Sequence, residues 1–433
     1  MEASTGKILA MVSKPAYDPN NILSDWSELN SDEENSPLLN RVTQGSYAPG
    51  STFKVVTTLA FMRQNSDYPN YTYDCNGEIS QGDITIHCFN GNAHGSEDLR
   101  SSFANSCNSS FANIGLGLDL TQYRQTAEDL LFNKSLPGIL NTAKSSFALD
   151  QNSSEGEVMM TAMGQGKTTV SPYHMALIAE AVANGGTMMQ PYLVESVTNY
   201  TGSQIRKNVP KSYKKVMTSD EAAQLKEYMT AVVEEGTGSV LKGRSYTAAG
   251  KTGTAEYSMS DGEKTHSWFM GFTNVDNPDL VISVITEGSD GSSSGKAVAI
   301  AGGYFRRLLQ LMGGEKMQTK FFCDLYVSEG WEKKKLKLIK KLQKNKLQPS
   351  VYVITLSQGK QNHLEYYSSL LLKQHIFDNV SLFIVGIANG YDGALSLIER
   401  IAEEAYEKTG EVNLRKFLLD RQEEFEKKEI RSV

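Results

Sequence analysis

Apolar residues recur along this chain at spacings that predict helices and strands, and the order of these elements changes near residue 314. Helical spacing predicts a buried helix over Ser51–Met62, which begins directly after the turn-forming pair Pro49-Gly50. A second apolar helix is predicted from Val170 to Val182, before Gly185-Gly186. The other strands predicted in this part cover 6–13, 84–86, 248–256, 267–273 and 280–287. One further helix is predicted after a capping Ser96, with two acids in its first turn and with Leu99 and Phe103 along it, and another covers 296–311.

Beyond the Gly313-Gly314 pair, predicted strands and helices alternate. That alternation is typical of a small parallel-sheet α/β domain. We therefore expect two domains, residues 1–314 and residues 315–433. The predicted elements of the second domain are strands over 321–327, 351–356 and 382–388 and helices over 331–346, 364–375, 395–407 and 414–428.

The composition is that of an ordinary globular protein, because 39% of the 433 residues are hydrophobic and 21% are charged. The net charge of -7 argues against a nucleic-acid partner, although residues 315–433 carry a small excess of basic residues. No window approaches the roughly 20 apolar residues of a membrane helix, and the first residues do not read as a secretion signal. The chain as written is expected to have no membrane anchor.

The four cysteines are Cys75, Cys88, Cys107 and Cys323, and none of them forms a Cys-x-x-Cys pair. Their spacing indicates neither a zinc site nor a disulfide scaffold. A bridge between Cys75 and Cys88 stays open, but unpaired thiols are the favoured interpretation. No metal ion and no cofactor are expected.

Candidate chemistry begins with the string Ser51-Thr52-Phe53-Lys54 at the start of the first predicted helix. A serine hydroxyl needs an adjacent base to act as a nucleophile, and a spacing of three places Lys54 on the same helix face as Ser51. Free N–H groups at the helix start favour the anion that forms during attack. The alternative for this string alone is a capping serine and a solvated lysine.

Two further strings follow along the chain, and they can supply the other groups that an acyl-transfer site needs. In Ser106-Cys107-Asn108, the hydroxyl can pass a proton and the amide can hold a substrate carbonyl, although an ordinary turn has the same composition. Lys251-Thr252-Gly253-Thr254 lies in a predicted strand, where ammonium and hydroxyl groups can bind a carboxylate. A polar edge strand is the alternative for this third string.

Together and in this order, the three strings resemble those of the penicillin-binding protein transpeptidases, over about residues 2–312. The resemblance implies an antiparallel sheet flanked by helices, with an all-helical lobe and a cleft between them. Members of the class B branch carry a membrane anchor and a further module before this domain, so the chain is expected to be a fragment or to have a misplaced start. Other strings that resemble the family are Gly6–Ser13, Tyr47–Lys54, His94-Gly95, Gly164-Gln165-Gly166, Ser171-Pro172 and Trp268–Phe272.

The resemblance also implies a role for each matching residue. Ser51 would be acylated by a D-Ala-D-Ala stem peptide of peptidoglycan, and Lys54 would be the base. Ser106 and Lys251 would relay the proton. Asn108 would orient the peptide. The remaining substrate-binding residues would be Thr252, Gly253 and Thr254, with the N–H groups of Ser51 and Thr254 forming the oxyanion hole.

Three functions share this chemistry up to the acyl-enzyme. The first is a D,D-transpeptidase on the outer face of the bacterial cytoplasmic membrane, inhibited by β-lactams and working with cell-division or elongation proteins. The second is a D,D-carboxypeptidase or serine β-lactamase, in which water takes the acyl group. The third is a penicillin sensor or scaffold whose acyl-enzyme persists. No string assigns a role to residues 315–433.

Overall fold

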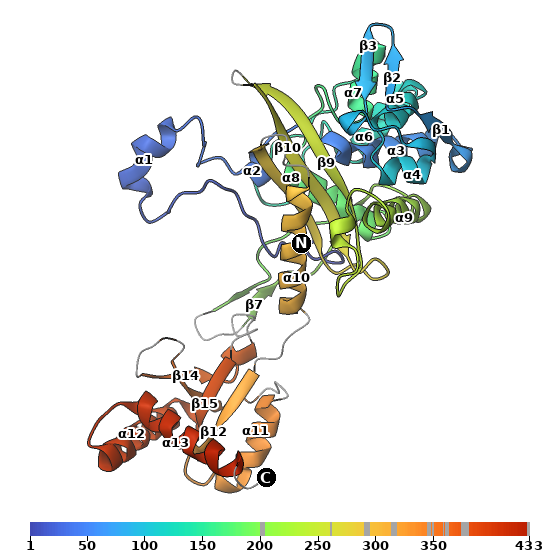
Figure 1. The fold of residues 1–433 in the computed structure, drawn as a ribbon. Helices are drawn as coiled ribbons and strands as arrows, with labels where there is room; N and C mark the ends of the chain where they lie inside the picture. Colours follow the sequence, from blue (N-terminus) through green and yellow to red (C-terminus); the bar gives the residue numbers. More distant parts are fainter. Residues whose placement is uncertain are drawn as a thin grey trace. The chain divides into compact units, whose positions relative to one another are not determined.

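The chain forms two compact units, Met1–Arg306 and Arg307–Val433, in a computed structural model. The structure describes all residues except 200–203, 260–261, 290–294, 313–317, 344–347, 349, 358, 360–362, 374–380 and 431–433. The predicted boundary at Gly313-Gly314 lies outside the described residues. Each unit is described by itself below (Figure 1).

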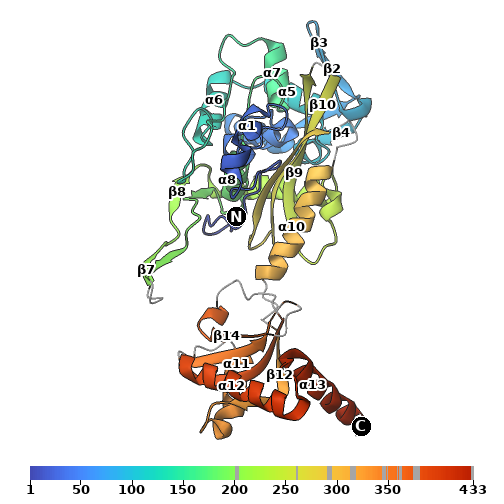
Figure 2. The same ribbon diagram turned by 90° about the vertical axis from the view of Figure 1, so that its left-hand side faces the viewer.

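A three-stranded antiparallel sheet stands at the centre of the first unit, in the order β11-β10-β9. Its strands are β9 (Ala248–Met259), β10 (Gly262–Thr273) and β11 (Val281–Ser289). Figure 2 shows α10 (Lys296–Met312) along one face of this sheet and α8 (Pro172–Ala183) on the other. Alternation along β10 explains both contacts, because Phe269 packs against Phe305 of α10, whereas Trp268 and Met270 join the core shared with α8.

A mainly helical lobe adjoins the sheet and carries the first two strings of the sequence. Its central helix, α3 (Lys54–Gln64), is buried over nearly its whole length, and its apolar residues pack against α5 (Asn108–Leu116) and α6 (Leu120–Asp129). The lobe also contains α4 (Leu99–Ala104) and α7 (Glu155–Ala162). The predicted antiparallel sheet with a helical lobe is confirmed.

The other elements of the first unit are short. The predicted strand over Gly6–Ser13 is wrong, because Lys7 makes only an isolated bridge to Tyr192 and the rest of the segment has no strand partner. The helical elements not yet given are α1 (Ile22–Ser31), α2 (Arg41–Gln44), η1 (Gly50–Phe53), η2 (Tyr68–Asn70), η3 (Phe89–Gly91), α9 (Ser219–Glu234) and η4 (Ser239–Leu241). The strands are β1 (Thr72–Cys75), β2 (Glu78–Gln81), β3 (Ile84–His87), β4 (Gly95–Asp98), β5 (Thr187–Met189), β6 (Ser196–Thr198), β7 (Gln204–Lys207) and β8 (Ser212–Lys215).

The second unit is a four-stranded sheet with helices, in the order β12-β15-β13-β14. Only β12 and β15 pair in parallel, so the expected parallel sheet is corrected to a mixed one. The predicted helix over 364–375 is wrong in its described part, because Leu364–Ser368 forms edge strand β14; Tyr366 and Tyr367 lie opposite β-branched residues of β13 there. The elements are β12 (Gln318–Val327), η6 (Glu332–Lys334), α11 (Lys335–Gln343), β13 (Val351–Leu356), β14, η7 (Leu371–Lys373), β15 (Ser381–Asn389), α12 (Gly390–Thr409) and α13 (Leu414–Ile430).

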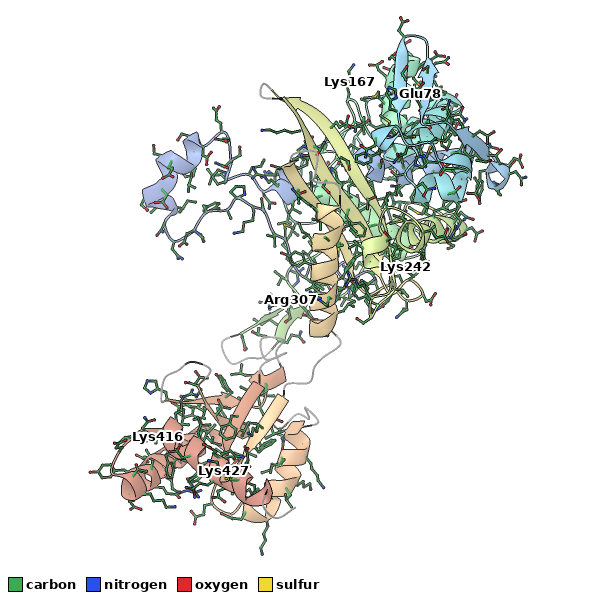
Figure 3. All side chains as sticks on the ribbon, viewed as in Figure 1. Glu78, Lys167, Lys242, Arg307, Lys416 and Lys427 are labelled. Atoms are coloured by element: carbon green, nitrogen blue, oxygen red, sulfur yellow. The ribbon has the colours of Figure 1, made fainter. Side chains whose placement is uncertain are left out.

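Side chains fill the interior of each unit (Figure 3), and each unit has its own apolar cores. In the second unit, one core lies between the sheet and α12 and α13, and it includes Ile354, Leu397 and Ile401. Among the described helices, none has both the length and the apolar character that crossing a membrane requires.

Candidate active site

Ser51 lies in the 3-10 turn η1, directly before the long buried helix α3. The backbone N–H of Lys54 donates to the carbonyl groups of Ser51 and Thr52. A 3-10 turn brings side chains three residues apart onto one side, so the Ser51 hydroxyl and the Lys54 amine leave the turn in the same direction. Ser51 is half-buried, whereas Lys54 is fully buried.

Strand β9 runs close to this turn, and glycines make the approach possible. Gly50 has a φ of +56°, and a Cβ atom there would lie 2.6 Å from the Thr254 carbonyl oxygen. A Cβ on Gly253 would lie 3.1 Å from the Thr52 backbone nitrogen. On the opposite side, the N–H of Gly50 donates to the Gly164 carbonyl over 2.8 Å. The first and third strings are therefore direct neighbours.

The Lys54 amine points at the second string. Its Nζ donates to the Ser106 carbonyl over 2.7 Å and to Asn108 Oδ1 over 2.8 Å, and it lies 3.3 Å from Ser106 Oγ. Asn108 is fixed in turn, because its Nδ2 donates to the carbonyl of His87 over 3.0 Å. The amide of Asn108 thus links the base candidate to the end of strand β3.

Lys251 approaches the same hydroxyl from strand β9. Its Nζ donates to Ser106 Oγ over 2.9 Å and to the Thr252 carbonyl over 3.1 Å. Ser106 has a φ of +60°, a left-handed conformation that costs free energy in a non-glycine residue. The Ser106 hydroxyl is therefore the point at which the lysines of the first and third strings meet.

Both lysines are fully buried, and burial changes their protonation. Desolvation lowers the pKa of Lys54 to about 7. Desolvation, followed by repulsion from Lys54, lowers the pKa of Lys251 well below its usual value. One aromatic ring lies near each amine, with Lys54 Nζ 5.2 Å from the ring centre of Phe111 and Lys251 Nζ 5.6 Å from that of Phe103. A site of this kind can hold a neutral amine near pH 7.

The remaining predicted residues lie along β9 beside the turn. The hydroxyl of Thr252 lies 2.5 Å from that of Thr237, which belongs to the loop after α9. Sequence reasoning missed Thr237; its only local signal is its position between Gly236 and Gly238. Gln165, by contrast, belongs to the family-like string Gly164-Gln165-Gly166, and its Nε2 is 3.5 Å from the Thr254 carbonyl oxygen.

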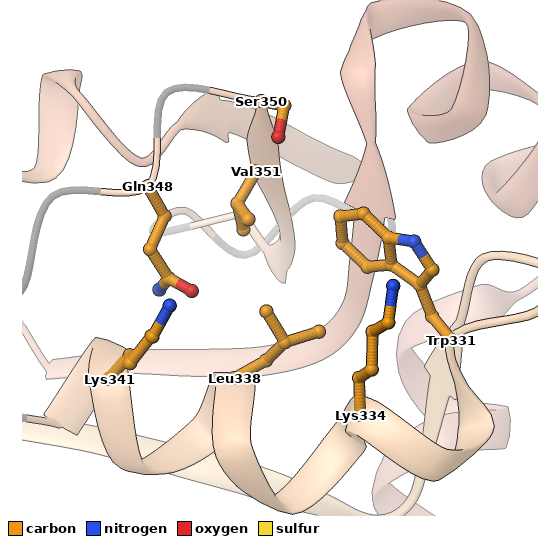
Figure 4. Close-up of a pocket in the computed structure, with 7 residues that line it drawn as sticks. All are labelled: Trp331, Lys334, Leu338, Lys341, Gln348, Ser350 and Val351. Atoms are coloured by element: carbon orange, nitrogen blue, oxygen red, sulfur yellow. The ribbon is translucent and has the colours of Figure 1, made fainter.

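A separate pocket of about 300 Å³ lies in the second unit (Figure 4). Two of its side chains are lysines, Lys334 and Lys341, and the described residues that line it include no carboxylate. It holds none of the three strings. The lining residues are Trp331, Lys334, Leu338, Lys341, Gln348, Ser350 and Val351.

The comparisons with known proteins concern the first unit. A family model described as "Penicillin binding protein transpeptidase domain" matches residues 1–310. The chain is 32% identical over 318 residues to peptidoglycan D,D-transpeptidase PbpA of Mycolicibacterium smegmatis, with 69% of this chain and 63% of that protein covered. It is 29% identical to stage V sporulation protein D of Bacillus subtilis, with 67% of this chain and 45% of that protein covered. The chain thus spans less than two thirds of the length of these relatives.

Solved structures give the same result for the fold. The D,D-transpeptidase domain of a peptidoglycan glycosyltransferase from Eggerthella lenta matches with a TM-score of 0.66 and 29% identity, over 72% of this chain and 77% of that one. The penicillin G acyl-enzyme complex of penicillin-binding protein A from M. tuberculosis matches with a TM-score of 0.61 and 29% identity, over 70% and 72% of the two chains.

Proposed function

Since this chain belongs to the penicillin-binding protein transpeptidase family, we propose that its first unit is a serine D,D-transpeptidase that cross-links peptidoglycan stem peptides. The observation that carries the proposal is the meeting of Lys54 and Lys251 at the Ser106 hydroxyl, beside the turn that holds Ser51. One nucleophile, one amine of lowered pKa and one proton-relaying hydroxyl are the parts that acyl transfer needs.

In the first step, Ser51 Oγ attacks the carbonyl carbon between the two D-Ala residues of a stem peptide, and its proton passes to Lys54. A neutral lysine amine has two hydrogens and one lone pair. The two shorter bonds of Lys54 Nζ, to Ser106 O and Asn108 Oδ1, would use both hydrogens and leave the lone pair for the proton of Ser51. The backbone N–H groups of Ser51 and Thr254 would hold the oxyanion.

In the second step, the bond to the terminal D-Ala breaks, and its nitrogen needs a proton. The Ser106 hydroxyl can supply it and be reprotonated by Lys251, which donates to that hydroxyl. Thr252 and Thr254 would hold the terminal carboxylate. An amine from a second stem peptide then attacks the acyl group on Ser51 and gives up one proton, which Lys251 would accept through the Ser106 hydroxyl. The cross-link forms, the bond to Ser51 Oγ breaks, and Lys54 would return its proton to that oxygen.

The site belongs to a cell-wall enzyme whose substrate lies on the outer face of the cytoplasmic membrane, so we place the working domain there. β-Lactams would act as covalent inhibitors because they resemble the D-Ala-D-Ala end and acylate the same serine. Cell-division or elongation proteins are the partners that we expect to direct it.

The test is incubation of the protein with a D-Ala-D-Ala stem peptide, with and without a second stem peptide that offers a free amine. A cross-linked dimer that needs Ser51 supports the transpeptidase. Release of D-Ala with water as the only acceptor indicates a carboxypeptidase instead. A persistent acyl-enzyme that forms no product in either mixture contradicts the proposal and indicates a sensor or scaffold.

A further inference from the structure

Three cysteines and one histidine gather in the helical lobe, and one of them, Cys107, is the middle residue of the second string. The ligand atoms of Cys75, Cys88, His94 and Cys107 all lie within 4.8 Å of one another. The three cysteines are buried, with exposures of 2% or less. The cluster is outside the acyl-transfer chemistry described above, which uses none of these side chains.

The spacing of the sulfur and nitrogen atoms fits a tetrahedral metal site. A zinc ion with Zn–S bonds of about 2.3 Å keeps its sulfur ligands about 3.8 Å apart in a tetrahedron, and a histidine nitrogen about 3.6 Å from each sulfur. In the structure, Cys88 Sγ lies 3.7 Å from both Cys75 Sγ and Cys107 Sγ. The Nδ1 atom of His94 lies 3.3 Å from Cys75 Sγ. Three of the tetrahedron's edges are thus already close to the required lengths.

The backbone brings these residues together from four separate segments. Strands β1 and β4 pair so that Cys75 lies opposite Gly95. His94 is the residue before Gly95, so this pairing brings His94 close to Cys75. Cys88 follows strand β3, and its N–H donates to the Gly77 carbonyl over 2.8 Å. Cys107 is the N-cap of helix α5. The hairpin of β2 and β3, in which Figure 3 labels Glu78, is the part of the chain between Cys75 and Cys88.

Polar groups around the sulfurs also suit thiolates rather than an apolar cysteine cluster. The buried hydroxyl of Ser109 lies 3.2 to 3.4 Å from all three sulfur atoms. The backbone N–H of Ser110 donates to Cys107 Sγ over 3.4 Å. Hydrogen bonds to metal-bound ligands orient them and tune their affinity for the metal. A Cys75–Cys88 disulfide would use only two of the four groups and leave Cys107 and His94 unexplained.

We propose that Cys75, Cys88, His94 and Cys107 bind one structural zinc ion as a closed Cys3His site. Binding releases the three thiol protons to solvent, and the neutral imidazole of His94 binds the ion through its unprotonated Nδ1 atom. With four protein ligands the ion has no open position, so its role is to hold the lobe together and not to activate water. The absence of Cys-x-x-Cys spacing, which argued against zinc, is explained because all four ligands come from different segments.

The zinc site would also fix the surroundings of Lys54. Cys107 stands between Ser106 and Asn108, and both of these residues accept hydrogen bonds from Lys54 Nζ. Cys88 directly follows His87, whose carbonyl accepts the hydrogen bond from Asn108. Two of the four ligands are therefore chain neighbours of the groups that orient the base. This coupling to acylation rests on the proposed function, whereas metal binding itself does not.

The first test is the metal content of the full chain purified without chelators. We expect one zinc ion per chain, and a visible absorption band of tetrahedral cobalt–thiolate coordination when Co²⁺ replaces zinc. Cys75→Ser should lower zinc retention by at least about tenfold, whereas Cys323→Ser, a matched thiol in the second unit, should retain it. If the Cys75 variant does not fold, chelator titration of the unaltered chain gives the same readout, with loss of zinc lowering its melting temperature.

Two results would overturn the metal site: a full chain without bound zinc that shows no cobalt–thiolate band, or a Cys75–Cys88 disulfide found by mass spectrometry. Equal zinc loss in the Cys323→Ser protein would place the ion elsewhere. For the coupling, we expect the benzylpenicillin acylation rate to fall at least about tenfold after zinc removal and to recover when zinc is returned. Zinc-bound protein that never acylates would contradict the proposed function and leave the metal site standing, whereas unchanged acylation without zinc would contradict the coupling.

Discussion

The two units of this chain differ in whether they bury ionisable side chains. The first unit buries Lys54 and Lys251 completely, together with Glu180 and His174. In the described part of the second unit, the buried polar side chains are all uncharged. A buried charge costs several kcal/mol unless it is compensated, so two buried lysine amines that share the Ser106 hydroxyl are candidates for a functional role.

The second unit uses its charges at the surface. Arg421 of α13 makes ion pairs with Asp324 and Glu404 at 2.5 and 2.9 Å, and all three side chains are partly exposed. The lysines of its pocket, Lys334 and Lys341, lie on or beside helix α11 at the surface. Exposed pairs contribute about 0–1 kcal/mol each. We therefore expect acylation rates to change when buried residues of the first unit are replaced and to stay the same after matched replacements in the second unit.

The largest effect is expected from Lys54→Met, which replaces the buried amine by an apolar chain of similar length. Loss of the base should slow acylation by benzylpenicillin about 10³-fold, because general bases contribute about 10²–10⁴-fold. Stopped-flow or quenched labelling measures the rate. Lys341→Met is the control in the second unit and should leave the rate unchanged; equal slowing in both variants would remove the distinction between the units.

A smaller effect is expected from Gly164→Ala. Gly164 has a φ of +90°, and a Cβ atom there would lie 1.8 Å from the Gly50 carbonyl oxygen, so the Ser51 turn must move. A displacement of about 1 Å can cost about 10²-fold in rate, and we expect a loss of that size together with a lower melting temperature. Gly303→Ala in α10, where the added atom meets nothing within 4 Å, is the matched control and should be neutral or stabilising. Normal acylation in the Gly164 variant would show that the turn does not depend on this contact.

The pH dependence gives a tenfold effect. Desolvation lowers the pKa of Lys54 to about 7, so the amine is mostly protonated at pH 6 and mostly neutral at pH 8. Because only the neutral amine accepts the proton of Ser51, acylation should rise about tenfold between these pH values and level off above them. A rate that is flat from pH 6 to pH 8 would show that Lys54 does not titrate there.

The smallest effect on chemistry is expected from Ile401→Ala in the core of the second unit. Removing this fully buried side chain should cost the second unit about 2–5 kcal/mol of stability. Acylation of Ser51 should keep its rate. Calorimetry combined with labelling of the same samples measures both, and a parallel loss of labelling would mean that the second unit supports the active site.

Much of the active site could be predicted from the sequence, because each of its three strings is local. The strings keep serine, lysine and threonine side chains at fixed spacing. The turn at Pro49-Gly50 and the strand over Ala248–Glu256 could also be predicted from the sequence. The structure then shows what spacing cannot, namely that Ser106 receives both lysines. The role of each residue stays a proposal.

The wrong predictions share one cause. The local spacing of apolar residues does not reveal which distant segments of the chain pair with one another. Leu364–Ser368 was predicted as the start of a helix, yet its tyrosines lie opposite residues of β13 in an edge strand. The antiparallel pairing of β13 with β14 and β15, which makes the second sheet a mixed one, was likewise not predicted. Cys75 and Cys107 meet only after β1 and β4 pair and α5 is capped, so their spacing carried no signal.

The most direct test of the central claim is mass spectrometry of the full chain after incubation with benzylpenicillin, with the adduct located by proteolysis. The account predicts one covalent penicilloyl group on the peptide that contains Ser51, absent from the Ser51→Ala protein and greatly slowed in the Lys54→Met protein. An adduct on another side chain, or undiminished labelling of the Ser51→Ala protein, would contradict it.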